Sequence, residues 1–280
     1  MSPTPINATP PPEPVGQTPQ PAFRVRNLSA GYPGRPQVLK DLNLDLPAEK
    51  FTAVLGPNGC GKSTLLLALS GLIKRTGDIE VLGMDLHRYP GRSLARTLSF
   101  LPQTPLAPEG ITVRNLVLRG REPHRSLLRP LTGKDTAAAE SALVRMHLET
   151  LADSPVSELS GGQRQRAWIA MTLAQDTHLL MLDEPTSYLD IAHQVEILST
   201  CSTLAAEGRT VVAVLHDLTL AARFADHIVV MANGKITATG SPSHVLNVEF
   251  LTDVFDLPCR VITDPDTGTP VILPSDPRTP

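Results

Sequence analysis

A glycine-rich segment that starts at Gly56 has the residue types that bind a phosphate chain. Glycines at close intervals permit a tight turn whose backbone N–H groups point inward and bind an anion. The apolar run FTAVL precedes the segment and the run LLLALS follows it, as a strand and a helix would. The start of that helix adds the positive end of its dipole. The segment reads Gly56-Pro57-Asn58-Gly59-Cys60-Gly61-Lys62-Ser63-Thr64.

Two side chains of this segment predict its chemistry. Lys62 is expected to lie along the β- and γ-phosphates of a nucleotide, and the Ser63 hydroxyl is expected to ligate Mg²⁺. A chance match in a glycine-bearing turn is the alternative, and average composition produces it in roughly 1% of chains of this length. Cys60 is interpreted as a small filler, although an electropositive loop could lower the pKa of its thiol. We therefore predict that Gly56–Thr64 binds the nucleotide.

Two adjacent carboxylates follow another apolar run. The run Leu179–Leu182 is typical of a buried strand, and it ends in Asp183, Glu184 and Pro185. Burying adjacent acids is costly unless a cation meets them. Beside a phosphate loop, Asp183 is expected to hold the Mg²⁺ shell and Glu184 to polarise an attacking water. An ordinary acidic turn after a strand is the alternative.

A second helix start with free N–H groups follows Leu159. It consists of Ser160, Gly161, Gly162 and Gln163, and the helical stretch RQRAWIAMTLA continues from it. A serine cap with two glycines lets a phosphate approach the backbone closely. A plain capped helix is the alternative, so the order of the motifs along the chain has to decide.

That order resembles the ATP-binding cassette (ABC) family of ATPase subunits, over about residues 22–257. The motifs are Tyr32, the phosphate loop, Gln103, Leu159–Gln163, Asp183–Glu184, Leu189-Asp190 and His216. The resemblance implies an α/β fold, with a P-loop NTPase core of mixed sheet flanked by helices and a helical subdomain inserted into it. It also implies an ATPase with ATP and Mg²⁺ as its cofactors.

The resemblance implies a role for each matching residue. Tyr32 would stack on adenine, and Gln103, in a loop between two prolines, would reach Mg²⁺ or the water. His216 would contact the γ-phosphate and orient the water with Glu184, so that the catalytic set is Lys62, Gln103, Glu184 and His216. Ser160–Gln163 would serve the ATP held by a partner chain, so that a homodimer sandwiches two nucleotides, with Asp190 at the interface.

Three further segments resemble the importer ATPases of the iron–siderophore, haem and cobalamin group. They are Gly120-Arg121-Glu122-Pro123-His124, the stretch 188–194, and the end segment from Val245 through Asp264-Pro265-Asp266-Thr267-Gly268. The resemblance favours uptake of a ferric siderophore, with cobalamin, haem, another solute or an exporter as alternatives. It implies membrane-spanning permease subunits, an extracytoplasmic solute-binding protein as an indirect partner, and a place at the cytoplasmic face of the cell membrane.

The elements that must position these residues are strands alternating with helices. Apolar runs predict buried strands, and longer periodic stretches predict helices. The predicted strands are Phe51–Leu55, Leu179–Leu182, Val211–Leu215 and Ile228–Met231. The predicted helices begin after Gly61, at 113–118, around 134–148, after Gly161 and at 191–206. The stretch 105–155 has helical patterns without strong strand candidates, which indicates a helical insertion, a subdomain of about residues 105–165.

Composition excludes several classes of protein. The formal net charge is −3, from 25 Lys and Arg against 28 Asp and Glu, which argues against a nucleic-acid partner. The three cysteines have neither metal-ligand spacing nor a disulfide framework, which fits a reducing compartment. No apolar run reaches the roughly 18 to 20 residues of a membrane span, and the N-terminus lacks the features of a secretory signal.

Proline predicts the division of the chain. Of 27 prolines, eight fall in residues 1–21 and six in 258–280, which leaves ordinary usage between them. Residues 1–21 are therefore expected to form a disordered tail, because proline removes backbone donors and buries little. Residues 22–257 are expected to form the ABC ATPase domain. Residues 258–280 are a C-terminal extension, in which an Asp-Thr-Gly turn predicts a short hairpin.

Overall fold

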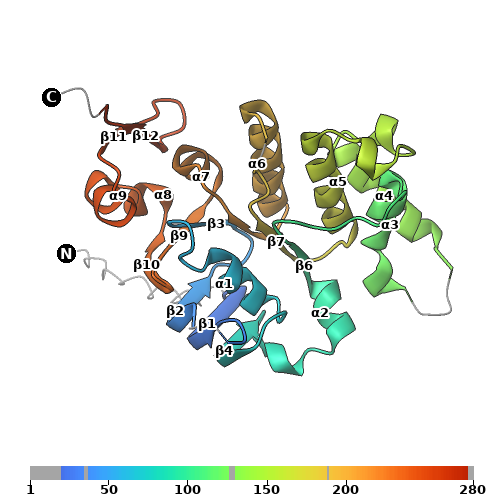
Figure 1. Cartoon of the computed structure of the whole chain (residues 1–280), viewed down its shortest axis with the longest axis horizontal. Helices are drawn as coiled ribbons and strands as arrows, with labels where there is room; N and C mark the ends of the chain where they lie inside the picture. The colour runs from blue at the N-terminus through green and yellow to red at the C-terminus, as the bar shows by residue number, and fades with distance from the viewer. Residues whose placement is uncertain (1–19, 35–36, 126–129, 188, 277–280) are drawn as a thin grey trace, which may run out of the picture.

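The structure is a computed structural model that describes residues 20–34, 37–125, 130–187 and 189–276. The expectations for most of the proline-rich tail and for residue 188 fall outside these ranges. Figure 1 shows the arrangement of the elements, with the central strands between two groups of helices.

The central sheet is built from the apolar runs. Every residue of β3, β7 and β8 is buried, because both faces of these parallel strands are covered. In the described part of the chain, the strand order is β10-β9-β3-β8-β7-β6. All neighbours are parallel except β10, which returns antiparallel to β9. The strands are β3 (Phe51–Leu55), β6 (Leu98–Leu101), β7 (Leu179–Asp183), β8 (Thr210–Val214), β9 (His227–Ala232) and β10 (Lys235–Gly240). The four predicted strands are confirmed to within one residue at each end.

A second, antiparallel sheet was not among the predicted strands. Its described strands follow the order β2-β1-β4-β5. The signal that could have found it is alternation, since β2 reads LKDLNLDL and every second residue from Leu42 to Leu46 is buried. The strands are β1 (Phe23–Ala30), β2 (Leu39–Leu46), β4 (Arg75–Val81) and β5 (Met84–Asp85).

Helices cover both faces of the central sheet. In Figure 1, α6 and α7 lie above the central strands, and α1 lies below them with the second sheet. Alternate strand residues divide the apolar interior, with Val54 facing α1 and Ala53 facing the opposite side. The helices here are α1 (Lys62–Leu69), α2 (Gly91–Thr97), α6 (Ile191–Ala206), α7 (Leu218–Phe224), α8 (Pro242–Val245) and α9 (Val248–Phe255).

The predicted insertion contains helices and short 3₁₀ turns. Its helices are α3 (Val113–Arg119), α4 (Gly133–Arg145) and α5 (Gly161–Ala174), and they contact one another. Among its described residues there is no strand, only an isolated bridge between Thr112 and Pro155. The helix predicted around 134–148 ends at Arg145, because the backbone turns left-handed at His147, with φ of 52°.

The predicted C-terminal hairpin is present. It consists of β11 (Cys259–Thr263) and β12 (Pro270–Pro274), paired antiparallel. Arg223 of α7 donates to Asp264 at 2.7 Å, and the Thr219 hydroxyl accepts from the Ile272 N–H at 3.3 Å. Ile272 is 7% exposed and belongs to the main apolar core. The hairpin is therefore held on the outer face of α7.

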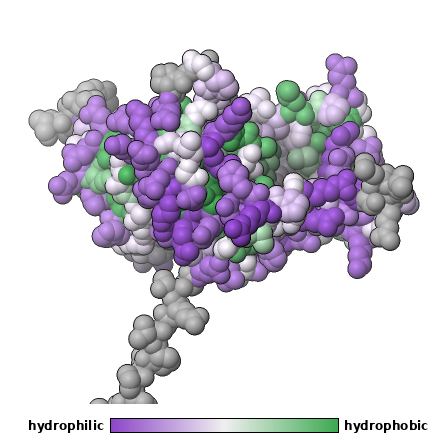
Figure 2. Space-filling view, turned by 90° about the horizontal axis from the view of Figure 1, so that it is seen from below, coloured by the Kyte–Doolittle hydropathy of each residue, from purple (hydrophilic) through white to green (hydrophobic). Residues whose placement is uncertain are grey.

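The outer surface is largely polar. The face turned toward the viewer in Figure 2 is mostly hydrophilic, with small apolar areas between. Within the described ranges, we find no helix with both the length and the apolar character that crossing a bilayer requires.

Candidate active site

The glycine-rich segment forms the turn between β3 and α1. Its three glycines have positive φ angles of 147°, 76° and 110° at Gly56, Gly59 and Gly61. A Cβ at Gly56 would lie 2.1 Å from the Met231 carbonyl oxygen, so both space and conformation require glycine there. The turn therefore leads directly into the N-terminus of α1, where the unpaired backbone N–H groups favour binding of an anion.

Lys62 lies folded over this turn. Its Nζ donates to the carbonyl oxygens of Gly56 at 2.8 Å and Pro57 at 3.2 Å, and the residue is 6% exposed. The Cys60 thiol is also buried, and burial raises its pKa more than the nearby Lys62 charge lowers it. The suggestion of a low thiol pKa was therefore wrong, because desolvation outweighs the electropositive surroundings.

Ser63 and Asp183 lie side by side between the turn and the end of β7. The Ser63 hydroxyl donates to Asp183 Oδ1 at 3.0 Å. Asp183 is 4% exposed, and burial raises its pKa above the ordinary value in spite of that hydrogen bond. One carboxylate and one hydroxyl are a donor set that fits Mg²⁺, which also takes phosphate and water oxygens. The described residues contain no group of three or more His, Cys, Asp or Glu that could hold a metal ion by themselves.

Glu184 is the centre of a second polar cluster. His216 Nε2 lies 2.8 Å from Oε1, while the Gln103 amide and the Ser187 hydroxyl donate to Oε2 at 2.7 and 2.9 Å. Burial raises the pKa of Glu184, but the hydrogen bonds from His216 and Ser187 outweigh it and leave that pKa below its ordinary value. The side chain is therefore an ionised carboxylate whose two oxygens are both held in place.

The backbone conformation at Glu184 is also unusual. Its φ is 52°, a left-handed conformation that is unfavourable for a residue with a long side chain. This conformation follows directly after β7 and turns the side chain toward residues from two other segments, Gln103 and His216. The sequence analysis did not predict that Ser187 donates a hydrogen bond to this carboxylate. The signal in the sequence is a hydroxyl residue three positions after Glu184, in a turn.

Tyr32 lies near the start of α1, as expected for a residue beside the loop. Its hydroxyl is 3.5 Å from the Thr64 hydroxyl, and the residue is 39% exposed. It lines a cavity of about 380 Å³ together with Lys74 and Arg75, which the sequence did not single out. These residues share a site because Arg75 pairs with Ala30 across β4 and β1, two residues before Tyr32.

The predicted residues Ser160–Gln163 form a separate group. Ser160 caps α5, accepting from the Gln163 N–H at 3.2 Å, while the Gln163 side chain accepts from the Ser160 N–H at 3.0 Å. Ser160 and Gly161 are exposed, and no hydrogen bond in the described part of the chain joins them to the phosphate loop. In Figure 1, α5 lies beyond α6, away from α1.

The fold and site together define a class of protein. The glycine-rich turn joins the buried strand β3 to the helix α1. Two carboxylates, Asp183 and Glu184, lie at the end of the parallel strand β7, and His216 follows β8, the strand between β3 and β7. This is the arrangement of a P-loop nucleoside triphosphatase.

The comparisons with known proteins are more specific. The sequence matches the model of the ABC transporter family over residues 39–187. It is 46% identical to a Bacillus subtilis (strain 168) protein named "Probable siderophore transport system ATP-binding protein YusV", over 90% of this chain and 92% of that protein.

Two solved structures are similar over most of the chain. One, of an inward-facing ABC transporter described as metal-chelate type, has a TM-score of 0.78 and 32% identity, covering 92% of this chain and 98% of that one. The other is a dimeric post-hydrolysis state of the ATP-binding cassette MJ0796 bound to ADP and Pi. It has a TM-score of 0.69 and 27% identity and covers 79% of this chain and 98% of that one.

This chain belongs to the ABC transporter family, and it is an ATPase of that family, which binds and hydrolyses ATP. Its α/β fold, a mixed sheet flanked by helices with a helical segment inserted, is that of an ABC ATPase.

Proposed function

We propose that this chain is the ATP-hydrolysing subunit of a system that imports ferric siderophores across the cytoplasmic membrane. The chemistry is supported above all by Glu184, an ionised carboxylate held by donors from three segments. The cargo is supported by the 46% identity to a siderophore transport ATP-binding protein and by the similarity to a metal-chelate type transporter.

The phosphate chain of ATP would lie over the loop Gly56–Thr64. Phosphoryl transfer needs positioning and charge neutralisation more than covalent chemistry. Lys62 Nζ is held by two carbonyl oxygens of the loop and can exchange them for phosphate oxygens. Tyr32 would stack on the adenine, because its ring stands beside the cavity next to the start of α1.

Ser63 and Asp183 would hold Mg²⁺, with Gln103 able to reach either the ion or the water. When bound, Mg²⁺ would supply positive charge to the β- and γ-phosphate oxygens. The raised pKa of Asp183 fits this role, because a buried carboxylate without a cation is costly and a cation removes the cost. In the structure Gln103 contacts Glu184 rather than Ser63 or Asp183.

Glu184 is assigned as the general base. Its carboxylate takes a proton from the attacking water while the water oxygen bonds to the γ-phosphorus. The bond from that phosphorus to the bridging oxygen breaks, and ADP leaves with the bridging electron pair. His216 keeps Oε1 oriented at 2.8 Å and would contact the γ-phosphate.

The second helix start would act on a nucleotide held by a second copy of the chain. Ser160 and Gly161 are exposed, and Ser160–Gln163 lies apart from the loop of its own chain. The dimer of the similar MJ0796 cassette supports a pair of cassettes. We assign the two copies to a homodimer with two ATP molecules between them. Asp190, which caps α6 through the His193 N–H at 3.0 Å, would lie at the interface.

The helical subdomain, which we assign to about residues 105–165, would dock to a membrane-spanning permease. A groove of about 340 Å³ lies between the segment Pro105–Glu109 and α5, lined by Trp168 and Arg164. Leu106 at its edge is 89% exposed, an apolar side chain suited to a partner surface. The chain would then lie at the cytoplasmic face of the membrane, and a solute-binding protein would act on it through the permease.

Reconstitution tests this function. The chain is combined with its permease in vesicles, and ATPase activity is measured as binding protein loaded with a ferric siderophore is added. We expect stimulation by that cargo and none with vesicles that carry Glu184→Gln. Stimulation by haem or cobalamin but not by a ferric siderophore would show that the assigned cargo is wrong. ATP-driven movement of solute in the opposite direction would show that the system is an exporter.

A further inference from the structure

The segment Gly120–His124 has no role in the function proposed so far. It follows α3 and contains a short 3₁₀ turn over Glu122–His124. The structure places it against the last turn of α5, the helix whose first turn is Ser160–Gln163. The two ends of α5 therefore carry the two segments that stand out in the sequence of the insertion.

Arg121 caps the C-terminal end of α5. Its Nη1 donates to the Ala174 carbonyl oxygen at 2.8 Å, where a helix leaves carbonyl groups unpaired and the dipole favours a cation. Its Nε donates to Asp135 Oδ1 at 3.1 Å, and both side chains are about nine-tenths buried. Asp135 also accepts from the Thr132 backbone and hydroxyl, so one guanidinium joins the end of α5 to the start of α4.

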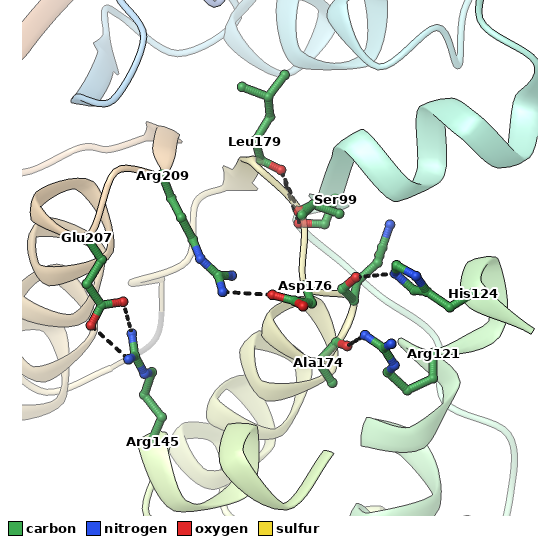
Figure 3. Close-up of polar contacts among 11 residues, drawn as sticks. Ser99, Arg121, His124, Arg145, Ala174, Asp176, Leu179, Glu207 and Arg209 are labelled. Atoms are coloured by element: carbon green, nitrogen blue, oxygen red, sulfur yellow. Dashed lines mark hydrogen bonds and ion pairs between the residues drawn. The ribbon is translucent and has the colours of Figure 1, made fainter. Parts of the chain in front are cut away.

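His124 and Gly120 act on the same turn. His124 Nε2 donates to the Gln175 carbonyl oxygen at 2.7 Å, beside the Arg121 contact shown in Figure 3. Gly120 has an ordinary helical backbone, but a Cβ there would lie 2.1 Å from the Met171 carbonyl oxygen. Glycine is needed at 120 for space, since α3 ends directly against the backbone of α5.

The end of α5 is also tied to the core. The Gln175 amide donates to the carbonyl oxygens of Ala95 in α2 at 2.6 Å and of Leu98, the first residue of β6, at 3.2 Å. Asp176 accepts from Arg209 at 2.9 Å, also drawn in Figure 3. The chain then enters β7, which ends at Asp183 and Glu184. The last turn of α5 is thus the junction between the insertion and the strand that carries the two carboxylates.

The position of the last turn of α5 affects the position of its first turn, because the helix is rigid and long. With 14 residues, α5 is about 21 Å long, so a tilt of about 5° at its C-terminus moves its N-terminus by about 2 Å. Misplacement of about 1 Å at a reacting site can cost about 100-fold in rate. A small shift of the backbone at Ala174 and Gln175 would therefore displace Ser160–Gln163 far enough to lower the rate of hydrolysis.

We propose that Gly120, Arg121 and His124 are positioning residues that hold the C-terminal end of α5, so that Ser160–Gln163 meets the nucleotide of the second copy. This inference rests on the proposed function, because the role of Ser160–Gln163 in a composite site belongs to it. Arg121 and His124 bind the carbonyl oxygens of Ala174 and Gln175, so they would act on the nucleotide only through the helix.

The test uses the full chain with Arg121→Lys and His124→Ala. Lysine keeps the charge beside Asp135 but lacks the fork that reaches Ala174 as well. Arg119→Ala is the matched control, because Arg119 ends α3 two residues before Arg121 and its ion pair with Glu122 is exposed. Thermal unfolding, the ATP dissociation constant of the separate chain, kcat and KM are measured, with ATP-driven dimerisation measured in a Glu184→Gln background.

We expect both variants to bind ATP within about twofold of the parent and to lose at least about 10-fold in kcat. Dimerisation should weaken by a similar factor, and the Arg119 control should change neither. Equal kcat and dimerisation in folded variants would overturn the proposal, as would a parallel loss of ATP affinity, which indicates a structural role. If Glu184→Gln itself keeps full turnover, the proposed function fails instead.

Discussion

At the scale of single residues, the two adjacent acids at the end of β7 differ in environment although they follow one another in the chain. Burial dominates at Asp183 and raises its pKa. At Glu184 burial also raises the pKa, but the hydrogen bonds from His216 and Ser187 together outweigh it and leave that pKa below its ordinary value. The first is suited to meet a cation, and the second is suited to accept a proton from water. Because Asp183 is buried, whereas Glu184 is held by His216, Ser187 and Gln103, neighbouring carboxylates can perform different tasks.

Glu184→Gln is the sharpest single change at this site. The amide keeps the shape of the side chain but cannot take a proton, so we expect ATP binding to persist and kcat to fall by at least about 100-fold. ATP-bound dimer should then accumulate and be visible in sedimentation. Turnover that persists in the variant would show that another group is the base. Ser187→Ala is the variant to compare with it, because it removes one hydrogen-bond donor to Glu184 and keeps the carboxylate.

At the scale of elements, an ion pair joins the segment that follows α3 to the first turn of α4, between Arg121 and Asp135. The Thr132 hydroxyl, the Thr132 backbone and Arg121 together lower the pKa of Asp135 to about 2, from an ordinary 3.8. A carboxylate with a lowered folded-state pKa stabilises the fold above its unfolded pKa. That contribution is lost as the pH falls from about 4 toward 2.

Asp135→Asn should lower the free energy of unfolding at pH 7 by roughly 2 kcal/mol, because each unit by which the fold lowers the carboxyl pKa corresponds to about 1.4 kcal/mol. The difference from the parent should shrink as the pH falls below about 4, because the parent carboxyl then becomes neutral as well. Urea unfolding at a series of pH values measures both effects. A difference that stays constant with pH would show that charge is not the cause.

The C-terminal hairpin is a second element whose role is packing. Ile272 of β12 is buried against α7, and Ile262 on the neighbouring strand is 50% exposed. Ile272→Ala should destabilise the fold by about 2 to 4 kcal/mol, while Ile262→Ala, the matched control, should stay within about 0.5 kcal/mol. Chemical unfolding decides between them, and equal losses would mean that the hairpin is not packed as described.

At the scale of the whole molecule, one chain holds both parts of the proposed composite site but keeps them apart. The phosphate loop is in the core and Ser160–Gln163 is on the insertion, without a hydrogen bond between them in the described ranges. The proposed head-to-tail pair of chains would bring each part to the other. Activity should therefore depend on which chain carries each part, and a mixing experiment can separate them.

Chains with Lys62→Ala are mixed with chains carrying Gly161→Trp, which blocks the exposed helix start. Each variant alone should be inactive in a homodimer. In the mixture, about half of the dimers contain one of each, and one site in those dimers is complete. ATPase activity should therefore return on mixing, measured at chain concentrations that permit dimerisation. Inactivity of the mixture, with both variants folded, would exclude the shared site.

The sequence by itself determined the chemistry and the buried parallel strands. The loop Gly56–Thr64, the pair Asp183–Glu184 and the capped start at Ser160 are contiguous, so their backbone and side-chain chemistry can be read locally. Strands such as Phe51–Leu55 are apolar throughout because both faces are covered. The order of motifs then led to the family that the comparisons confirm.

Only the tertiary structure decided which distant groups meet. The second sheet, the contacts of Gln103 and His216 with Glu184, and the capping of α5 by Arg121 join segments far apart in sequence. Such pairings depend on strand register and helix packing, which residue types restrict but do not specify. A glycine at 120 is an ordinary helix end in the sequence, and only the 2.1 Å between a Cβ there and the Met171 carbonyl shows why nothing larger fits.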